Sequence, residues 1–224
     1  MKRLEDKTKL IEVLKEKYKE GKTVFIFDFD GTLVNSEPIH FDAHKEVYKL
    51  ITGKELDDEN RKNHAGGTNR ETYEKLRKDT GIDFDIEWAT REKSERALKL
   101  MKKEKLFDFF FDIVKTFPDT KKIIVSNQEE WVLKDILKYF DIAKYFEKTF
   151  SLSKLLVPKP EFYDRLFEFT KIDYQNAIVF EDSQTVIDKA MEKGIFTVGI
   201  DNGYNSKLLK KVDIIIKSKI WREE

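Results

Sequence analysis

The stretch Val24-Phe25-Ile26-Phe27-Asp28-Phe29-Asp30-Gly31-Thr32-Leu33 decides the fold of this chain. Its first four residues form an apolar run, which ends abruptly at two carboxylates and a glycine turn. Residues i and i+2 of a strand point to the same side, so we expect Asp28 and Asp30 to share one face at the carboxyl end of a strand. Two carboxylates about 4 Å apart repel by about 4 kcal/mol at an effective dielectric near 20. The arrangement calls for a cation between them, and a divalent metal ion is the obvious candidate.

Two further apolar runs end in the same way. Ile123-Ile124-Val125 leads into Ser126, and the run from 177 to 180 leads into Glu181. Such runs, separated by segments of helical periodicity, are typical of parallel strands buried on both faces, and ligands bind beyond the carboxyl ends of these strands. If the strands are neighbours, the side chains that converge are Asp28, Asp30, Ser126, Asn127, Glu181 and Asp182.

Lys159 adds a positive charge to this set. It lies between Pro158 and Pro160, which restrict the backbone before the next helix begins, so we expect its ammonium group to be held in place. Carboxylates and waters suit Mg²⁺, while a lysine and small hydrogen-bond donors suit phosphate oxygens. The chemistry predicted from these residue types is phosphoryl transfer.

The periodicity along the chain predicts an α/β fold with an insertion. Residues 36–104 show helical patterns and no convincing strand, so they predict an all-helical cap domain. Residues 22–35 and 105–224 carry the strands and predict the catalytic core, a doubly wound, Rossmann-like and mostly parallel sheet. Residues 1–21 predict an extra N-terminal helix with apolar positions at Leu4, Ile11, Leu14 and Tyr18.

Composition excludes several classes of function. The 224 residues include 43 basic and 43 acidic side chains, so nothing suggests a nucleic acid or an anionic membrane as a partner. The chain has 0 cysteines, which excludes disulfides and a thiol nucleophile. No apolar run approaches the roughly 18 residues of a membrane span, and no signal peptide is visible. We expect a cytoplasmic protein, monomeric by default, that acts on a small molecule.

Four motifs in order resemble the haloacid dehalogenase superfamily. They are Asp28-Phe29-Asp30-Gly31-Thr32-Leu33-Val34-Asn35-Ser36-Glu37-Pro38, Ser126-Asn127, Lys159-Pro160 and Glu181-Asp182-Ser183. Together they span nearly the whole chain, and they are similar to those of the helical-cap branch, which includes β-phosphoglucomutase-like and phosphoglycolate-phosphatase-like proteins.

The resemblance implies a role for each core residue. Asp28 resembles the nucleophile that accepts the phosphoryl group as an aspartyl phosphate, and Asp30 resembles the acid and base that serves the leaving alcohol and then water. The implied Mg²⁺ ligands are the Asp28 carboxylate, the Asp30 backbone carbonyl and Asp182, with Glu181 as a further or indirect ligand. The implied phosphate-binding residues are Thr32, Ser126, Asn127 and Lys159.

The resemblance also points to the cap for substrate specificity. The loop from His64 through Gly67 to Arg70 precedes the second cap helix, where similar proteins select their substrates. His40 occupies the place near the hinge where β-phosphoglucomutase-like proteins often carry a histidine. Arg70, Lys99 and His40 could together hold a sugar phosphate.

These residues leave three functions open. The first is a Mg²⁺-dependent phosphatase for a small soluble phosphomonoester, such as a sugar phosphate. The second is a β-phosphoglucomutase-like mutase, which returns the phosphoryl group to another hydroxyl of the sugar. The third, a catalytically silent binding protein, is disfavoured because such a protein has no need of mutually repelling carboxylates at Asp28, Asp30 and Asp182.

Overall fold

The computed structural model describes residues 2–4, 7–56, 68–153 and 159–217. Its strands are β1 (Lys2–Leu4), β2 (Val24–Phe27), β3 (Lys121–Ser126), β4 (Lys148–Ser151), β5 (Ala177–Glu181), β6 (Phe196–Asp201) and β7 (Ile214–Lys217). Its α-helices are α1 (Lys7–Lys19), α2 (Glu37–Thr52), α3 (Asn69–Thr80), α4 (Ile86–Met101), α5 (Phe109–Thr116), α6 (Glu130–Tyr139), α7 (Lys159–Thr170) and α8 (Gln184–Glu192). Among these described segments, no helix has the length and apolar character required to cross a bilayer.

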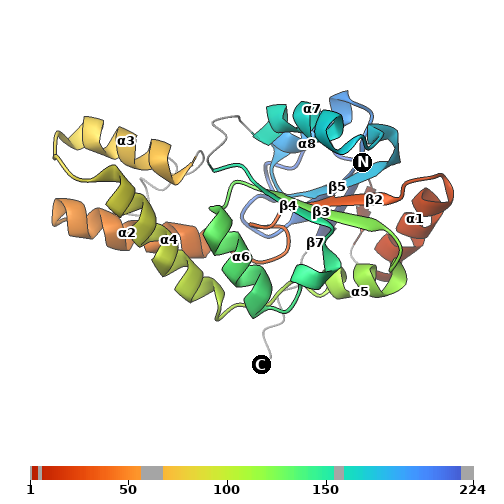
Figure 1. Ribbon diagram of the computed structural model, residues 1–224, viewed down its shortest axis with the longest axis horizontal. Helices are drawn as coiled ribbons and strands as arrows, with labels where there is room; N and C mark the ends of the chain where they lie inside the picture. The colour runs from red at the N-terminus through yellow and green to blue at the C-terminus, as the bar shows by residue number, and fades with distance from the viewer. Residues whose placement is uncertain (1, 5–6, 57–67, 154–158, 218–224) are drawn as a thin grey trace. The chain divides into compact units, whose positions relative to one another are not determined.

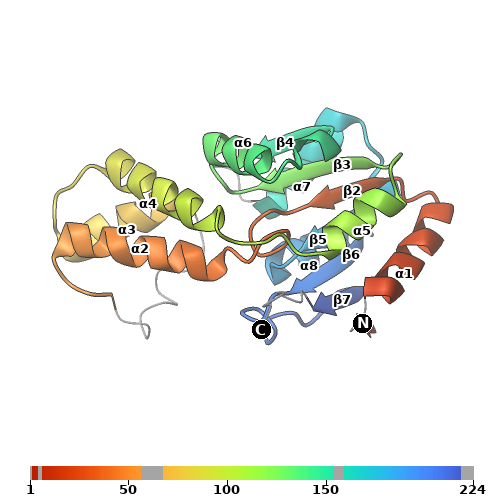
Figure 2. The same ribbon diagram turned by 90° about the horizontal axis from the view of Figure 1, so that it is seen from below.

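The strands form one seven-stranded sheet in the order β1-β7-β6-β5-β2-β3-β4, and every neighbouring pair is parallel. Helices α7 and α8 cover one face, whereas α1, α5 and α6 cover the other (Figures 1 and 2). Burial of both faces explains why the strands are almost continuously apolar in sequence. The predicted α/β fold with a doubly wound parallel sheet is confirmed.

Strand β2 occupies the position that matters for function. From β2 the chain builds the sheet outward through β3 and β4, then returns to the other side of β2 to add β5, β6 and β7. In open parallel sheets such a reversal of strand order creates a crevice at the carboxyl ends of the strands, where ligands bind. The topology therefore predicts that the residues directly after β2, β3 and β5 form the site.

Alternation along β2 divides its side chains between the two faces. Val24 and Ile26 pack in a cluster with Leu166 of α7 and Val186 of α8. On the opposite face, Phe27 stacks on Phe180 with ring centroids 4.4 Å apart. The next even-numbered position after Ile26 is therefore directed toward the face that carries α7.

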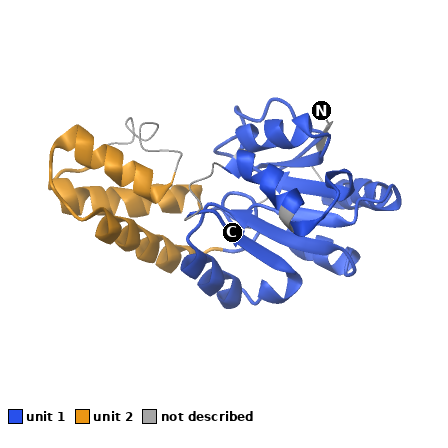
Figure 3. Cartoon of the chain, turned by 45° about the horizontal axis from the view of Figure 1, so that its top comes forward, with its two compact units in different colours: residues 1–35, 105–224 blue, residues 36–104 orange. Residues whose placement is uncertain are grey.

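The chain divides into two compact units, and Figure 3 colours them separately. The sheet unit comprises residues 1–35 and 105–224, and the helical unit comprises residues 36–104. The helices expected between residues 36 and 104 are found as α2, α3 and α4. The helical unit has its own core, formed by the buried side chains of Val47, Tyr73, Leu76, Ile86 and Ala89.

The N-terminus differs from its prediction. Residues 1–21 were expected to form a helix that included Leu4, but Lys2–Leu4 is strand β1, which pairs parallel with β7 at the edge of the sheet. Helix α1 starts at Lys7 and buries Leu10 and Leu14. The prediction was wrong for residues 2–4 because their backbone partners lie more than 200 residues away, at Ile214 to Ile216, where no local pattern can indicate them.

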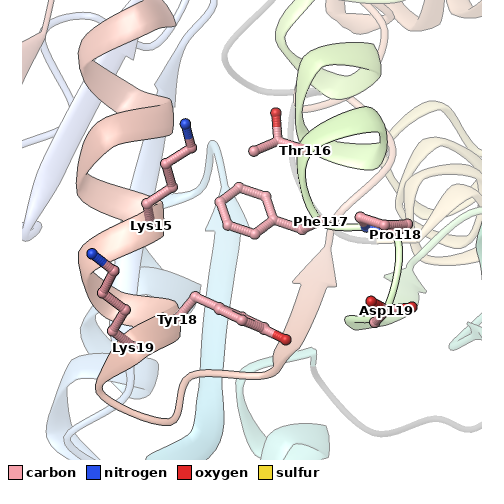
Figure 4. Close-up of a pocket in the computed structure, with 7 residues that line it drawn as sticks. All are labelled: Lys15, Tyr18, Lys19, Thr116, Phe117, Pro118 and Asp119. Atoms are coloured by element: carbon pink, nitrogen blue, oxygen red, sulfur yellow. The ribbon is translucent and has the colours of Figure 1, made fainter.

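A small cavity lies beside this N-terminal addition. It encloses about 250 Å³ between α1 and the segment that follows α5. The rings of Tyr18 and Phe117 form its apolar wall, and Lys15 and Lys19 extend along α1 at its edge (Figure 4). None of the predicted site residues lines this cavity.

The aromatic cluster behind β2 generates the first prediction. Phe27 is fully buried, stacks on Phe180, and meets the edges of Phe110 and Phe146. Phe27→Ala should lower the free energy of unfolding by about 3–5 kcal/mol, because the substitution leaves a cavity in a close-packed core. Urea denaturation followed by far-UV circular dichroism measures this loss.

The matched control is Leu208→Ala, at an apolar side chain that is 61% exposed. Its effect should stay within about 0.5 kcal/mol. Equal losses in the two variants would contradict the central position assigned to Phe27.

Candidate active site

Asp28 is the first residue beyond β2, and it is almost completely buried. Its carboxylate belongs to a residue with only 4% exposure, and its backbone N–H donates to the carbonyl of Phe180 at 3.0 Å. That hydrogen bond prolongs the β2–β5 pairing by one residue, so Asp28 continues the alternation set by Val24 and Ile26. The buried carboxylate therefore faces the side of the sheet covered by α7.

Lys159, the first residue of α7, contacts this carboxylate directly. Its Nζ donates a hydrogen bond to Asp28 Oδ1 and lies 2.8 Å from Glu181 Oε2. The side chains of Lys159, Asp28 and Glu181 are only 6%, 6% and 1% exposed. Isolated buried charges are very costly, so the two carboxylates and the ammonium group must be considered together.

Burial and charge shift the pKa values of this cluster. Burial raises the pKa of the Asp28 carboxyl well above its ordinary value, and the charges of Glu181 and Asp30 raise it further, although Lys159 opposes them. Burial works to lower the pKa of Lys159, but the carboxylates of Asp28 and Glu181 outweigh it and hold that pKa above its ordinary value. The ammonium group is thus retained, and the raised pKa of Asp28 indicates that Lys159 by itself does not offset burial and the neighbouring acidic groups.

Asp182 brings a further carboxylate to the same place. One oxygen each from Asp28, Glu181 and Asp182 can be chosen so that all lie within 4.8 Å of one another. Carboxylate oxygens are hard ligands suited to Mg²⁺. The donor set and its uncompensated negative charge therefore fit a divalent cation.

The second carboxylate oxygen of Glu181 also accepts hydrogen bonds. Its Oε1 accepts hydrogen bonds from the backbone N–H groups of Asp182 at 3.2 Å and Ser183 at 3.1 Å. Its Oε2 faces Lys159. Glu181 therefore stabilises both the turn after β5 and the position of Lys159.

The turn after β2 depends on Gly31. The residue has a φ of 71°, and its N–H donates to the carbonyl of Val34 at 2.9 Å. A Cβ atom at this position would lie 2.2 Å from Asp182 Oδ2 and 2.8 Å from Asn202 Nδ2. Only glycine allows the turns after β2 and β5 to approach so closely.

Asp30 has a different environment from Asp28. It is half-buried, and Ser126 Oγ donates to its Oδ2 at 3.4 Å. The side-chain amide of Gln128 lies 3.5 Å from both Asp30 oxygens, and its backbone N–H donates to Ser126 Oγ at 3.0 Å. The sequence reasoning missed Gln128, because a glutamine two residues after a strand carries no recognisable signal.

The phosphate-binding candidates divide into two groups. Ser126 and Thr32 are fully buried, Ser126 contacts Asp30, and Thr32 Oγ1 has no hydrogen-bond partner among the described residues. Asn127, by contrast, has an exposed side chain. The side chains of Ser126 and Thr32 are therefore more constrained by burial than the side chain of Asn127.

The helical unit contains the remaining candidates. His40 is half-buried, and its Nδ1 lies 2.9 Å from Nζ of Lys93, a buried lysine of α4 that the sequence reasoning missed. Arg70 is exposed and forms ion pairs with Glu74 and Glu87. Lys99 is also exposed.

Two further candidates, His64 and Gly67, lie outside the described residues. The structure therefore adds nothing to the roles expected of them. Among the three cap candidates that the structure describes, His40, Arg70 and Lys99, His40 alone is partly buried and hydrogen-bonded to a second ionisable side chain.

Comparison with known proteins identifies the family. Residues 25–200 match the model of the haloacid dehalogenase-like hydrolases, which covers all four sequence motifs. The chain belongs to this family. Its members are enzymes, and the buried carboxylates and lysine therefore lie in the core of a haloacid dehalogenase-like hydrolase.

The chain is similar in sequence to a phosphorylated carbohydrates phosphatase from Thermotoga maritima. It is 26% identical over 179 residues, which cover 76% of this chain and 81% of the relative. Two solved structures share the hydrolase fold. CbbY from Rhodobacter sphaeroides, in complex with phosphate, has a TM-score of 0.72 at 17% identity and covers 86% of this chain and 92% of its own. A β-phosphoglucomutase from Clostridium difficile has a TM-score of 0.67 at 19% identity, with coverages of 88% and 91%.

Crowding around Gly31 generates the second prediction. Gly31→Ala adds a Cβ atom at a positive φ and against Asp182 Oδ2, so it combines backbone strain with overpacking. The matched control is Gly194→Ala, at a φ of 73° with nothing within 4 Å of the new Cβ atom. In urea denaturation, Gly31→Ala should lower the free energy of unfolding by about 1–3 kcal/mol more than Gly194→Ala does. Losses of the same size would contradict the close approach of the two turns.

Proposed function

We propose that this chain is a Mg²⁺-dependent phosphatase that hydrolyses a small phosphomonoester, a phosphorylated carbohydrate, through an aspartyl phosphate. One observation carries the proposal: the carboxylates of Asp28, Glu181 and Asp182 gather around a site that already includes the buried ammonium group of Lys159. A phosphate dianion can approach a carboxylate nucleophile only where positive charge offsets the repulsion between them.

In the first step, an oxygen of Asp28 attacks phosphorus while the bond from phosphorus to the leaving alcohol oxygen breaks. Asp30 gives a proton to that oxygen, so the product leaves as a neutral alcohol. The phosphoryl group is then an aspartyl phosphate on Asp28. The surroundings of Asp30 differ from those of Asp28 and suit it to proton transfer. Asp30 is only half-buried, and Ser126 and Gln128 hold it through long hydrogen bonds.

In the second step, Asp30 accepts a proton from water, and the water oxygen attacks phosphorus. The bond between phosphorus and Asp28 breaks, which releases inorganic phosphate and restores the carboxylate. Asp30 thus ends the cycle protonated, as it began it, because the proton taken from water replaces the one given to the alcohol.

The residues that would hold Mg²⁺ are Asp28, Asp182 and the backbone carbonyl of Asp30. When bound, the ion supplies the positive charge that offsets repulsion between the substrate and Asp28. We assign Glu181 an indirect part, because Lys159 and two backbone N–H groups already engage its two oxygens. Lys159, Ser126 and Thr32 are the groups assigned to phosphoryl oxygens, and Asn127 contributes from an exposed position.

Similarity to the phosphorylated carbohydrates phosphatase of Thermotoga maritima supports the proposed substrate class. We infer that the substrate is a small sugar phosphate bound from solution. His40 and Lys93 of the helical unit are candidates for binding the part of the sugar phosphate that does not react. Their side chains contact each other and carry hydrogen-bonding nitrogen atoms. A location in the cytoplasm accords with such a substrate.

The third prediction tests the nucleophile and the metal. With p-nitrophenyl phosphate as substrate, the chain should release inorganic phosphate in Mg²⁺ and lose this activity in excess EDTA. Asp28→Asn should lower kcat by at least about 10³-fold, because the amide cannot form the aspartyl phosphate. The matched control, Asp79→Asn at an exposed position on α3, should retain wild-type activity.

Two outcomes would contradict this mechanism. Turnover by Asp28→Asn above a few per cent of wild type would remove Asp28 from the nucleophilic role. Absence of any turnover by the wild-type chain in Mg²⁺, with this substrate and with a panel of sugar phosphates, would favour a silent binding protein.

The fourth prediction separates phosphatase from mutase. Phosphorus NMR of the enzyme with β-glucose 1-phosphate and Mg²⁺ should reveal growth of the inorganic phosphate signal. The aspartyl phosphate of a mutase must instead survive until a second hydroxyl of the sugar reaches it. Accumulation of glucose 6-phosphate without inorganic phosphate would replace the phosphatase with the mutase as the function of this chain.

A further inference from the structure

Asn202 joins two turns of the candidate active site, although it belongs to none of the four sequence motifs. It follows β6 and is only 4% exposed. Its Nδ2 donates one hydrogen bond to the carbonyl of Gly31 at 3.1 Å and another to Asp182 Oδ2 at 2.9 Å. A single side-chain amide therefore connects the turn after β2 to the carboxylate that follows β5.

The orientation of this amide is determined by its other end. Asn202 Oδ1 accepts hydrogen bonds from the backbone N–H groups of Tyr204 at 3.1 Å and Asn205 at 3.3 Å. Both N–H groups of Nδ2 and both lone pairs of Oδ1 are therefore used. A reversed amide would direct Oδ1 toward two oxygens and Nδ2 toward two N–H groups, so the observed orientation is strongly preferred.

The turn that carries Asn202 is itself held from the other side. The backbone N–H of Asn202 donates to Asn205 Oδ1 at 3.1 Å. Asn205 Nδ2 donates to the carbonyls of Asp182 at 2.7 Å and Ile200 at 2.8 Å. Asn205 thus contacts only the backbone of Asp182, whereas Asn202 contacts its carboxylate.

Close packing leaves Asp182 little freedom once Asn202 is in place. Gly31 lies so near that a Cβ atom there would overlap Asp182 Oδ2 and crowd Asn202 Nδ2. A hydrogen bond to one carboxylate oxygen restricts rotation of the carboxylate about its terminal torsion. The carboxylate is therefore oriented before any cation binds.

We propose that Asn202 is a positioning residue for the metal site, which orients the Asp182 carboxylate toward Mg²⁺ and holds it next to the Gly31 turn. The inference rests on the proposed function, because it assumes that Asp182 is a ligand of Mg²⁺. Groups that hydrogen-bond a ligating side chain typically contribute a factor of about 10–100 to metal affinity. Asn202 acts through Asp182 and touches neither substrate nor metal.

The deciding variant is Asn202→Ser. A serine oxygen can still accept hydrogen bonds from the backbone N–H groups of the following turn, but its side chain is too short to reach Asp182. Mg²⁺ affinity, measured by isothermal titration calorimetry on phosphate-free protein, should fall about 10- to 100-fold. The Mg²⁺ concentration for half-maximal phosphatase activity should rise by the same factor, while kcat at saturating Mg²⁺ stays within about threefold of wild type.

The matched control is Ser206→Ala. Ser206 lies in the same loop as Asn202, its Oγ donates to Asp201 Oδ1 at the end of β6, and it has no described contact with Asp182. The control should bind Mg²⁺ within about twofold of wild type, even if it melts at a lower temperature. Thermal unfolding of all variants in EDTA tests whether each one folds. If the serine variant does not, Asn202→Thr replaces it, because threonine keeps the hydroxyl acceptor and is also too short to reach Asp182.

The outcomes distinguish this inference from the proposed function. Mg²⁺ binding by wild type with unchanged affinity in Asn202→Ser would overturn the role of Asn202 and leave the metal site standing. An equal loss of affinity in Ser206→Ala would also overturn it, since the effect would then come from the loop as a whole. No Mg²⁺ binding by the wild-type chain would overturn the metal site and this inference together.

Discussion

The structure depends on how it compensates the charge of a buried carboxylate. Asp28 and Glu181 lie at the ends of adjacent strands, and in the described structure Lys159 is the cation between them. Removal of an ionised group from water costs several kcal/mol, and it is tolerated only where opposite charge and hydrogen bonds replace the lost hydration. One ammonium group cannot balance Asp28, Glu181 and Asp182, so the site retains negative charge that a divalent cation can offset. This imbalance connects the fold to the metal-assisted phosphoryl transfer that we propose.

The sheet topology brings the members of this site together. Strand β2 has β5 on one side and β3 on the other, so residues that follow three strands meet at one edge. The alternation of β2 directs Asp28 toward the face covered by α7, whose first residue is Lys159. Side chains on the other face form an aromatic cluster around Phe27, which provides a rigid support for the turn that follows. Stability and chemistry thus use opposite faces of the same short strand.

The candidate functional side chains of the two units differ in how many contacts hold them in position. In the sheet unit, the carboxylates have several partners each, and the backbone of the two turns contributes to their positions. In the helical unit, the candidates Arg70 and Lys99 are exposed side chains, whereas His40 is half-buried and contacts the buried Lys93. Replacement of an exposed charged side chain changes the free energy of unfolding little. Replacement of one member of a buried polar pair costs more, because the other member loses its hydrogen-bond partner. The reaction chemistry is accordingly more tightly constrained by the described structure than the choice of substrate.

The sequence by itself determined the parallel sheet, most helices, and the set of carboxylates at the strand ends. It could do so because apolar runs that stop at polar residues are local patterns, and parallel strands bring their ends to a common edge. Only the tertiary structure decided the position of β1, the contacts of Gln128 and Lys93, the two partners of Lys159, and the bridge from Asn202 to Gly31 and Asp182. Asp28 and Lys159 are 131 residues apart, and Gly31 and Asn202 are 171 apart. Contacts at such separations arise from the packing of whole elements, which leaves no mark on the local pattern of the chain.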